Sequence, residues 1–498
     1  LLILLTWAIG VSPQFYVDPL GVPQNLPDTL SSLTLMSLVF AVIFGAGPVA
    51  VLFLRRFSEA RPVMTLAATA VIVPLAILMV LYGKTTGFAP SARFAALALL
   101  LAVLLGPVTE MLYRVRSEQR PGLASASAIF AVGCLAAIAL GLTLLLDKAW
   151  LTLALLPLPL AITWVYSKRA LPPLRIVAAV TGVLVAIRVL WDPVINSTPG
   201  DLILLNWLLI GYGGAAASCF GAAWLLRQRR GDDQAVQVLE GLALLLAALL
   251  IILEVRHAFG GLAGWRLDPP RGLSFAEAAT HSVTALAFTL GRARLSLAHS
   301  SAVIAYAASF ARIATLAWIG VVMLVIKNPW VTGVVLGDHA IFNWALLGYG
   351  GGALLAILIA WFDRAGGREN EAMAMAVAAL LLGFNGLNLL IASLFRGPGF
   401  AGFTMGAGEL YSYSAAWLAI GVALLFLGVR FASRSLRIGS AVLVGLAVLK
   451  VFLVDMSGLT GLWRALSFIG LGLVLMLVGR IYQRLLGRAQ TPIAKAGP

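Results

Sequence analysis

The chain has 498 residues, of which 61% are hydrophobic and only 11% are charged, and its formal net charge is +15. Average soluble domains contain about 25% charged residues, so this composition excludes an ordinary water-soluble protein. Apolar runs long enough to cross a bilayer recur along the chain. Lipid offers the backbone no hydrogen-bond partners, so these runs predict helices, and the alternating pattern of a transmembrane barrel is absent from the sequence. The sequence predicts an all-α, polytopic transmembrane helix bundle.

Hydropathy predicts roughly 16 crossings in chain order. The opening LLILLTWAIG is too short to span, and we expect it to be the end of a helix that begins before residue 1. The segment 276–297 is the weakest span because Arg292 and Arg294 lie near its end. The predicted spans cover 1–10 (partial), 35–56, 63–83, 94–114, 124–146, 149–168, 175–195, 203–226, 234–257, 276–297, 303–326, 342–362, 371–395, 409–431, 437–456 and 460–483.

Basic residues concentrate in every second predicted loop, and the loops between them are poorer in Lys and Arg and contain aspartates such as Asp201 and Asp338. Basic loops favour the cytoplasm, so this alternation predicts a cytoplasmic C-terminus and places the aspartates outside. The positive net charge then reflects topology and contact with anionic lipid, not nucleic-acid binding. Membrane lipid is therefore an expected partner, and nucleic acid is not.

Two segments are near-identical: NWLLIGYGG starts at Asn206, and NWALLGYGG starts 137 residues later at Asn343. At the same offset Arg175 falls on Arg312, and Gly200–Asp201 falls on Gly337–Asp338. The period covers four helices, an even number, so the sequence predicts parallel internal repeats, unlike the inverted repeats of many transporters. The predicted divisions are N-terminal helices over 1–174, repeats over 175–311 and 312–436, and a C-terminal helix pair with a cytoplasmic tail over 437–498.

The GYGG of each repeat resembles part of a potassium-channel filter, but neither copy follows Thr-Val and one chain supplies no four-fold ring. Both copies lie within predicted apolar helices, where small residues allow helices to approach closely. We interpret these as packing glycines.

Charged side chains gather at helix ends that the topology places outside the cytoplasm. Ionisable groups at the edge of a bilayer are expensive, so they usually pair with one another or serve a function. Carboxylates beside a histidine suit acid/base chemistry, proton coupling or binding of an anionic headgroup, whereas an ion-pair network that joins helix ends is the structural alternative. This candidate outer-face polar site comprises Glu254, Arg256, His257, Glu277, His281, Glu409 and Tyr411.

Two basic residues near the outer ends of their spans define a second candidate site. Asp192 follows Arg188 by four residues, and Asp455 follows Lys450 by five. A related register aligns LRIVAAVTGVLVAIR with LRIGSAVLVGLAVLK, so that each base follows an arginine, Arg175 or Arg437, by 13 residues. Equivalent bases of two repeats suit an anion-binding or coupling site, and snorkelling toward the interface is the alternative. The set comprises Arg188, Asp192, Lys450, Asp455 and Arg464.

The sequence contains no metal-ligand spacing and no cofactor motif. His257 and His281 lack the i, i+4 spacing of a zinc helix, and the two cysteines, Cys134 and Cys219, lie in separate apolar helices. No ATP-binding loop or Rossmann glycine motif is present. We therefore expect no cofactor and no metal ion, and no residue is assigned a catalytic role.

The C-terminal half resembles a known family on three stretches. These are LEVRHAF (253–259), ELYSYSAAWLAIGVALLFLGVR (409–430) and SLRIGSAVLVGLAVLKVFLVDMSGLTGLWRALSFIGLGLVLMLVGRIYQR (435–484). They are similar to the predicted bacterial membrane proteins of the domain of unknown function two-three-three-nine. The resemblance implies a multi-pass protein of the bacterial inner membrane and brings no established activity. The residues that match its motifs are Glu254, Arg256, His257, Glu409, Tyr411, Lys450, Asp455, Arg464 and Ser467.

Three functions remain open. The preferred hypothesis is handling of a cell-envelope substrate (a lipid, glycan precursor or anionic solute) at the extracytoplasmic side, as a transporter or translocation component. The second is a membrane-embedded transferase that uses the outer carboxylates and His257. The third is a non-catalytic scaffold that binds an extracytoplasmic protein partner on the loops 258–275 and 396–408.

Overall fold

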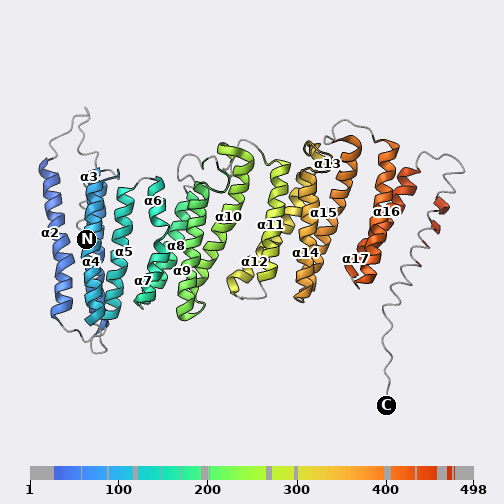
Figure 1. Cartoon of the computed structure of the whole chain (residues 1–498). Coiled ribbons are helices and arrows are strands. Elements are labelled where there is room, and N and C mark those ends of the chain that lie inside the picture. Colours follow the sequence, from blue (N-terminus) through green and yellow to red (C-terminus); the bar gives the residue numbers. More distant parts are fainter. Residues whose placement is uncertain are drawn as a thin grey trace, which may run out of the picture. The chain divides into compact units, whose positions relative to one another are not determined.

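The computed structural model is helical throughout the residues that it describes, and no strand occurs among them (Figure 1). The predicted spans over 1–10 and 460–483 lie outside or almost wholly outside those residues. The described residues are 27–55, 57, 59–86, 89–115, 122–146, 148–169, 171–191, 200, 202–264, 272–295, 301–397, 405–431, 434–456, 468–470, 472–473, 476 and 480.

Thirteen helices of the described residues are long and apolar enough to cross a membrane. Each of them overlaps a span that the sequence predicts, and the ends agree to within six residues. A further helix, α11 (Phe275–Leu295), covers the weakly predicted span 276–297 but is not among the thirteen. The all-helical, multi-pass architecture is therefore confirmed, whereas the total of about 16 crossings stays a prediction.

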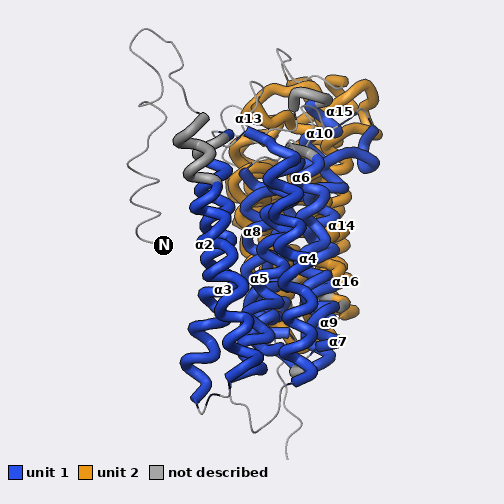
Figure 2. The backbone as a smooth tube through the Cα atoms, turned by 90° about the vertical axis from the view of Figure 1, so that its left-hand side faces the viewer, with its two compact units in different colours: residues 1–270, 301–304 blue, residues 271–300, 305–498 orange. Residues whose placement is uncertain are grey.

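The chain divides into two compact units, coloured separately in Figure 2. Unit 1 comprises residues 1–270 and 301–304, and unit 2 comprises 271–300 and 305–498. This grouping follows contacts and not internal similarity, so it leaves the predicted repeat boundaries untested. We describe each unit by itself.

The helices of unit 1 pack against one another through five groups of buried apolar residues. At several of these contacts a glycine lets the neighbouring helix approach closely. Pro157 separates α6 from α7, because proline cannot donate the backbone hydrogen bond that a continuous helix needs there. The helices of unit 1, with η for a π-helix, are α2 (Pro27–Leu54), α3 (Ala60–Thr86), α4 (Ala92–Val115), α5 (Leu123–Leu145), α6 (Lys148–Leu155), α7 (Leu158–Lys168), α8 (Pro173–Trp191), η2 (Leu209–Gly213), α9 (Gly214–Arg230) and α10 (Gln234–Gly264).

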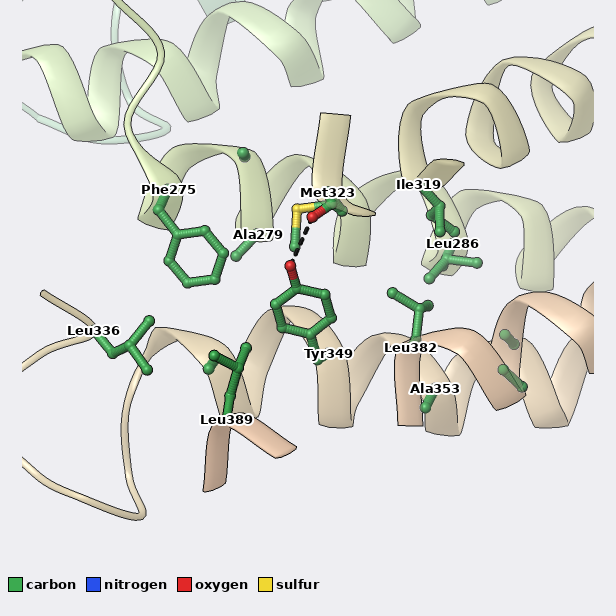
Figure 3. Close-up of a cluster of buried hydrophobic side chains, with 14 of the residues drawn as sticks. Phe275, Ala279, Leu286, Ile319, Met323, Leu336, Tyr349, Ala353, Leu382 and Leu389 are labelled. Carbon is green, nitrogen blue, oxygen red and sulfur yellow. Dashed lines mark hydrogen bonds between the residues drawn. The ribbon is translucent and has the colours of Figure 1, made fainter. Parts of the chain in front are cut away.

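Unit 2 is built around one core in which α11 and the following helices meet (Figure 3). Tyr349 lies fully buried at its centre, and its hydroxyl donates a 2.6 Å hydrogen bond to the carbonyl of Met323. Phe275 stacks on the same ring at a centroid distance of 6.0 Å. Besides α11, the elements of unit 2 are α12 (Ala302–Ala317, its first residues in unit 1), η3 (Trp318–Ile326), α13 (Pro329–Thr332), η4 (Leu346–Gly351), α14 (Gly352–Ala365), α15 (Glu369–Arg396), α16 (Ala407–Arg430), α17 (Arg434–Lys450) and η5 (Val451–Asp455).

The structure differs from the predicted spans at the start of both near-identical segments. The predictions begin helices at residues 203 and 342, but residues 202–206 and 333–343 are not helical, and each following helix opens as a π-helix, η2 or η4. Irregular backbone in a membrane protein occurs where it is buried in protein or lines a cavity, and π-helical turns are frequent at functional sites. Hydropathy counts apolar residues and does not register either feature.

Candidate functional site

In unit 1 the segment before η2 turns sharply and then caps the helix. Gly200 has a φ of 103°, and Leu204 has a φ of 73°, which only glycine adopts without steric cost. The side-chain oxygen of Asn206 accepts hydrogen bonds from the backbone N–H groups of Leu208 (2.8 Å) and Leu209 (3.2 Å). These bonds satisfy donors that the first turn of a helix leaves unpaired.

In unit 2 the matching segment has the same turn glycine and the same helix cap, but Ile341 lacks the positive φ of its match, Leu204. Gly337 has a φ of 140°, and the side-chain oxygen of Asn343 accepts from Ala345 and Leu346 at 3.1 Å each. Leu336, fully buried, accepts a bond from the backbone N–H of Trp344. The hydroxyl of Ser393 on α15 donates a 2.6 Å bond to the Ala340 carbonyl and so fixes the segment to the end of that helix.

Two grooves flank the start of η4 in unit 2. The larger has a volume of about 770 Å³, is open to the surface, and extends from the Gly337 turn along η4. The smaller, of about 270 Å³, lies between the same segment and α15 and α16. Asn343, Leu346 and Gly350 line both grooves. The larger groove, hereafter the η4 groove, is lined by Gly337, Asp338, His339, Phe342, Asn343, Trp344, Leu346, Leu347, Gly350, Gly351 and Leu354.

The η4 groove is apolar along its length and polar at one end. Phe342, Trp344 and Leu354 are exposed, with 78%, 39% and 59% of their surface accessible. Asp338 and His339, also exposed, stand at the Gly337 turn. A groove of this kind, in a helix bundle that crosses a membrane, suits a molecule with an apolar tail and a polar headgroup.

The packing interpretation of the GYGG glycines is confirmed for Gly348. A Cβ atom there would lie 2.7 Å from the Cβ of Ala279 and 3.0 Å from the terminal methyl of Met323. At Gly351, by contrast, the nearest atom to an added Cβ would be 3.9 Å away. Gly350 and Gly351 face the η4 groove, so one motif supplies both a tight helix contact and a groove wall.

Of the predicted outer-face site, Glu254 and His257 lie together on α10 of unit 1 and are both buried. The amide of Asn206 joins them: it donates a 2.9 Å bond to Oε2 of Glu254 and lies 3.4 Å from Nδ1 of His257. The backbone N–H of Leu204 points to the same carboxylate oxygen at 3.4 Å. Glu254 forms no ion pair within the described part of the chain, and its Oε1 has no hydrogen-bond partner there. Arg256, the next predicted member, is partly exposed.

Glu277 and His281 belong to unit 2, near the start of α11. They lie one helical turn apart, with His281 Nε2 3.8 Å from Glu277 Oε1. The imidazole packs edge-on against Trp318 at a centroid distance of 5.7 Å. Ser274 accepts a bond from the backbone N–H of Glu277 and caps the helix. The pair is therefore built into the α11–η3 contact.

Glu409, at the start of α16 in unit 2, is almost completely buried and bound by Arg396 at the end of α15. Nε of Arg396 donates to both carboxylate oxygens at 2.9 Å, and the Tyr413 hydroxyl donates to Oε1 at 2.8 Å. The guanidinium also lies 5.7 Å from the ring centroid of Trp330 on α13. These contacts join three helix ends, whereas Tyr411 is 56% exposed and takes no part in them. Here the structure favours the ion-pair network over a reactive carboxylate.

In the second candidate site, Lys450 and Asp455 form an ion pair. Lys450 Nζ, in unit 2, donates to Asp455 Oδ1 (2.7 Å), the Ser414 hydroxyl (2.7 Å) and the Leu410 carbonyl (2.8 Å). These bonds occupy all three donors of the ammonium group, so none is left for an anion. Arg188 lies on α8 of unit 1, partly buried, and Asp192 and Arg464 lie outside the described residues. Whether Arg188 and Lys450 act together stays a prediction.

Sequence reasoning missed several of these partners. Arg396 was assigned only to a loop, and His339 and Asn206 were not chosen as site residues although they lie in or beside the near-identical segments. The repeated Gly-Asp and Asn-Trp pairs were the available signal. Within the described residues, no group of three or more His, Cys, Asp or Glu is arranged to hold a metal ion.

A family model described as "Predicted membrane protein (DUF2339)" matches residues 2–485. The chain belongs to this family. No curated protein and no solved structure matches the chain. Membership extends the resemblance of the C-terminal half to nearly the whole sequence, and it confirms a membrane protein without naming an activity.

Proposed function

We propose that this DUF2339 protein handles a membrane-borne amphiphile, an envelope lipid or lipid-linked precursor, at the extracytoplasmic face of the bacterial inner membrane, as a transporter or translocation component. The observation that carries the proposal is the η4 groove, with Phe342, Trp344 and Leu354 along it and Asp338 and His339 at its end. Burying a CH₂ group of an apolar tail stabilises binding by about 0.8 kcal/mol when the tail comes from water, but not when it comes from the apolar interior of a bilayer. The groove would therefore select a lipid by its shape and its headgroup.

Topology supports the proposed face. The groove end contacts α15 through Ser393, and α15 ends at Arg396 next to Trp330 and Glu409. These residues precede or follow loops that the alternation of basic residues assigns to the extracytoplasmic side, with the C-terminus in the cytoplasm. The groove would then open toward the outer leaflet.

The proposal includes the parallel four-helix repeats. The two near-identical segments share a positive-φ glycine, a capping asparagine, a π-helical turn and a buried tyrosine, Tyr212 or Tyr349. The matching arginines also behave alike: Arg175 pairs with Asp233 before α10, and Arg312 pairs with Glu371 on α15. These shared features of the two near-identical segments support the proposed repeats.

A groove-filling variant tests the proposal. The protein is reconstituted in vesicles that contain a lipid with a photoreactive group in its acyl chain, and crosslinked peptides are quantified by mass spectrometry. We expect the wild-type protein to be labelled more strongly over 337–354 than at other exposed, lipid-facing positions such as Val442 on α17. Gly351→Leu fills the groove without an initial clash and is expected to remove the excess labelling.

Gly320→Leu is the matched control, because Gly320 lies in another π-helix, has nothing within 4 Å of an added Cβ and does not line either groove. Leaflet-to-leaflet movement of a fluorescent lipid in the same vesicles should fall with Gly351→Leu and not with the control. Uniform labelling along the lipid-facing helices would reject the groove as a site. A chemically altered lipid after incubation would favour the transferase instead.

A further inference from the structure

The charge at the polar end of the η4 groove is one-sided. Asp338 is the one acidic side chain among the lining residues, which include His339 but neither Lys nor Arg. Within the described part of the chain, Asp338 takes part in no ion pair or hydrogen bond. An exposed carboxylate without a partner is thus available to a ligand that occupies the groove.

The basic residues that could reverse this charge are engaged elsewhere. Arg396 is bound to Glu409 by three contacts, and Lys450 is bound to Asp455. Lys327, at the end of η3, does not line the groove. The groove therefore offers a headgroup the negative charge of Asp338, and neither Lys nor Arg lines it to bind phosphate.

The neighbouring polar groups are already used by the protein. Asn343 accepts two backbone N–H groups through its side-chain oxygen, and its amide donates to the Ala340 and His339 carbonyls. The asparagine can therefore hold the turn but has little capacity left for a ligand. Trp344, beside it, presents an aromatic surface that attracts cations.

We propose that the η4 groove selects lipids whose headgroup carries an ammonium group, which the Asp338 carboxylate would contact. This inference rests on the proposed function. A carboxylate at the membrane interface attracts an ammonium group and repels a headgroup whose only charge is a phosphate. Asp338 is then a specificity-determining residue, and the groove walls supply affinity for the tail without regard to headgroup.

Two photoreactive lipids with identical acyl chains, one with an ethanolamine and one with a glycerol headgroup, test this selection in vesicles of the wild-type protein. We expect labelling over 337–354 to favour the ethanolamine lipid by about two- to fivefold, the range for a partly exposed ion pair. Asp338→Asn should bring the ratio to about one without reducing the glycerol lipid's labelling. Glu369→Gln, which neutralises an exposed acid on α15 outside either groove, should leave the ratio unchanged.

Failure of the two proposals can be told apart. Equal labelling of the groove by both lipids, or preference for the glycerol lipid, would overturn the ammonium selection while the groove remains a lipid site. A preference for the ethanolamine lipid that is unchanged in Asp338→Asn would also overturn the ammonium selection. If neither lipid labels the groove above the other lipid-facing positions, the proposed function itself falls. A choline-headgroup lipid, which carries a quaternary ammonium group, should also be labelled above the glycerol lipid, and labelling at the level of the glycerol lipid would overturn selection by charge.

Discussion

The two near-identical segments share a turn glycine, a capping asparagine and a π-helical turn, but they differ in what surrounds the asparagines. In unit 1 the Asn206 amide is bound to the buried Glu254 and lies beside His257. In unit 2 the Asn343 amide bonds, among the described residues, to carbonyls of its own turn, and Asp338 is exposed at an open groove. The capping asparagine and the π-helical turn are thus the common framework. What differs is the acid bound to the asparagine amide: Glu254 in unit 1, with Ile391 at the matching position in unit 2.

The largest expected effect distinguishes the two asparagines. Asn343→Ala removes a helix cap, which costs about 1 kcal/mol. Asn206→Ala removes the same cap and also the donor to a buried carboxylate, for a total of about 2–4 kcal/mol. Thermal unfolding of the purified variants measures the difference. In the double variant Asn206→Ala/Glu254→Leu, the cost of leaving the buried carboxylate without its donor should largely disappear. Equal destabilisation by Asn206→Ala and Asn343→Ala would contradict the difference between the two segments.

Two glycines of the second motif should respond oppositely to a methyl group. Gly348→Ala places a Cβ 2.7 Å from Ala279 and should lower the free energy of unfolding by about 1–3 kcal/mol. Gly351→Ala faces the groove and should be neutral or raise it by up to about 1 kcal/mol, since alanine favours a helix. Unfolding in denaturing detergent measures both, and a stable Gly348→Ala variant would contradict the tight contact between η4 and α11.

The buried tyrosines sharpen the comparison further. Tyr349→Phe removes the hydrogen bond to the Met323 carbonyl and should cost about 1 kcal/mol. For Tyr212 the described residues include no hydroxyl partner, so Tyr212→Phe should change the unfolding temperature little. A similar drop in the unfolding temperature of both variants would mean that a hydroxyl hydrogen bond stabilises each of the two cores.

Prediction from sequence succeeded where one physical constraint acts alone. A bilayer permits only long apolar helices, so hydropathy located the thirteen helices that the structure describes as able to span. It failed at residues 203–206 and 342–343, because an apolar composition does not distinguish the first turn of a helix from an irregular segment that ends in a capping asparagine.

The candidate site was less predictable, because pairing depends on distance between helices. That Glu409 would meet Arg396, and that Lys450 would have all three of its donors occupied, follows from how helix ends pack and not from local sequence. Glu254 and His257 were recognisable since three residues on a helix bring two side chains onto one face. The groove depends on Gly350 and Gly351, which composition alone assigns to packing.

The smallest expected effect concerns the one non-glycine residue with positive φ among the described residues, Leu204. Its matching residue, Ile341, has no such conformation, so the copies differ in backbone strain as well as in charge. Leu204→Gly relieves a conformation that costs about 1–2 kcal/mol, and 63% of the leucine is exposed, so the unfolding temperature should rise slightly. Ile341→Gly relieves no strain and increases the conformational entropy of the unfolded chain, so it should lower the unfolding temperature.

If both glycine variants are destabilised, Leu204 contributes packing that outweighs its strain. If Leu204→Gly stabilises the fold but weakens the bond from its backbone N–H to Glu254, seen as faster amide exchange, then the strain is retained to hold that carboxylate.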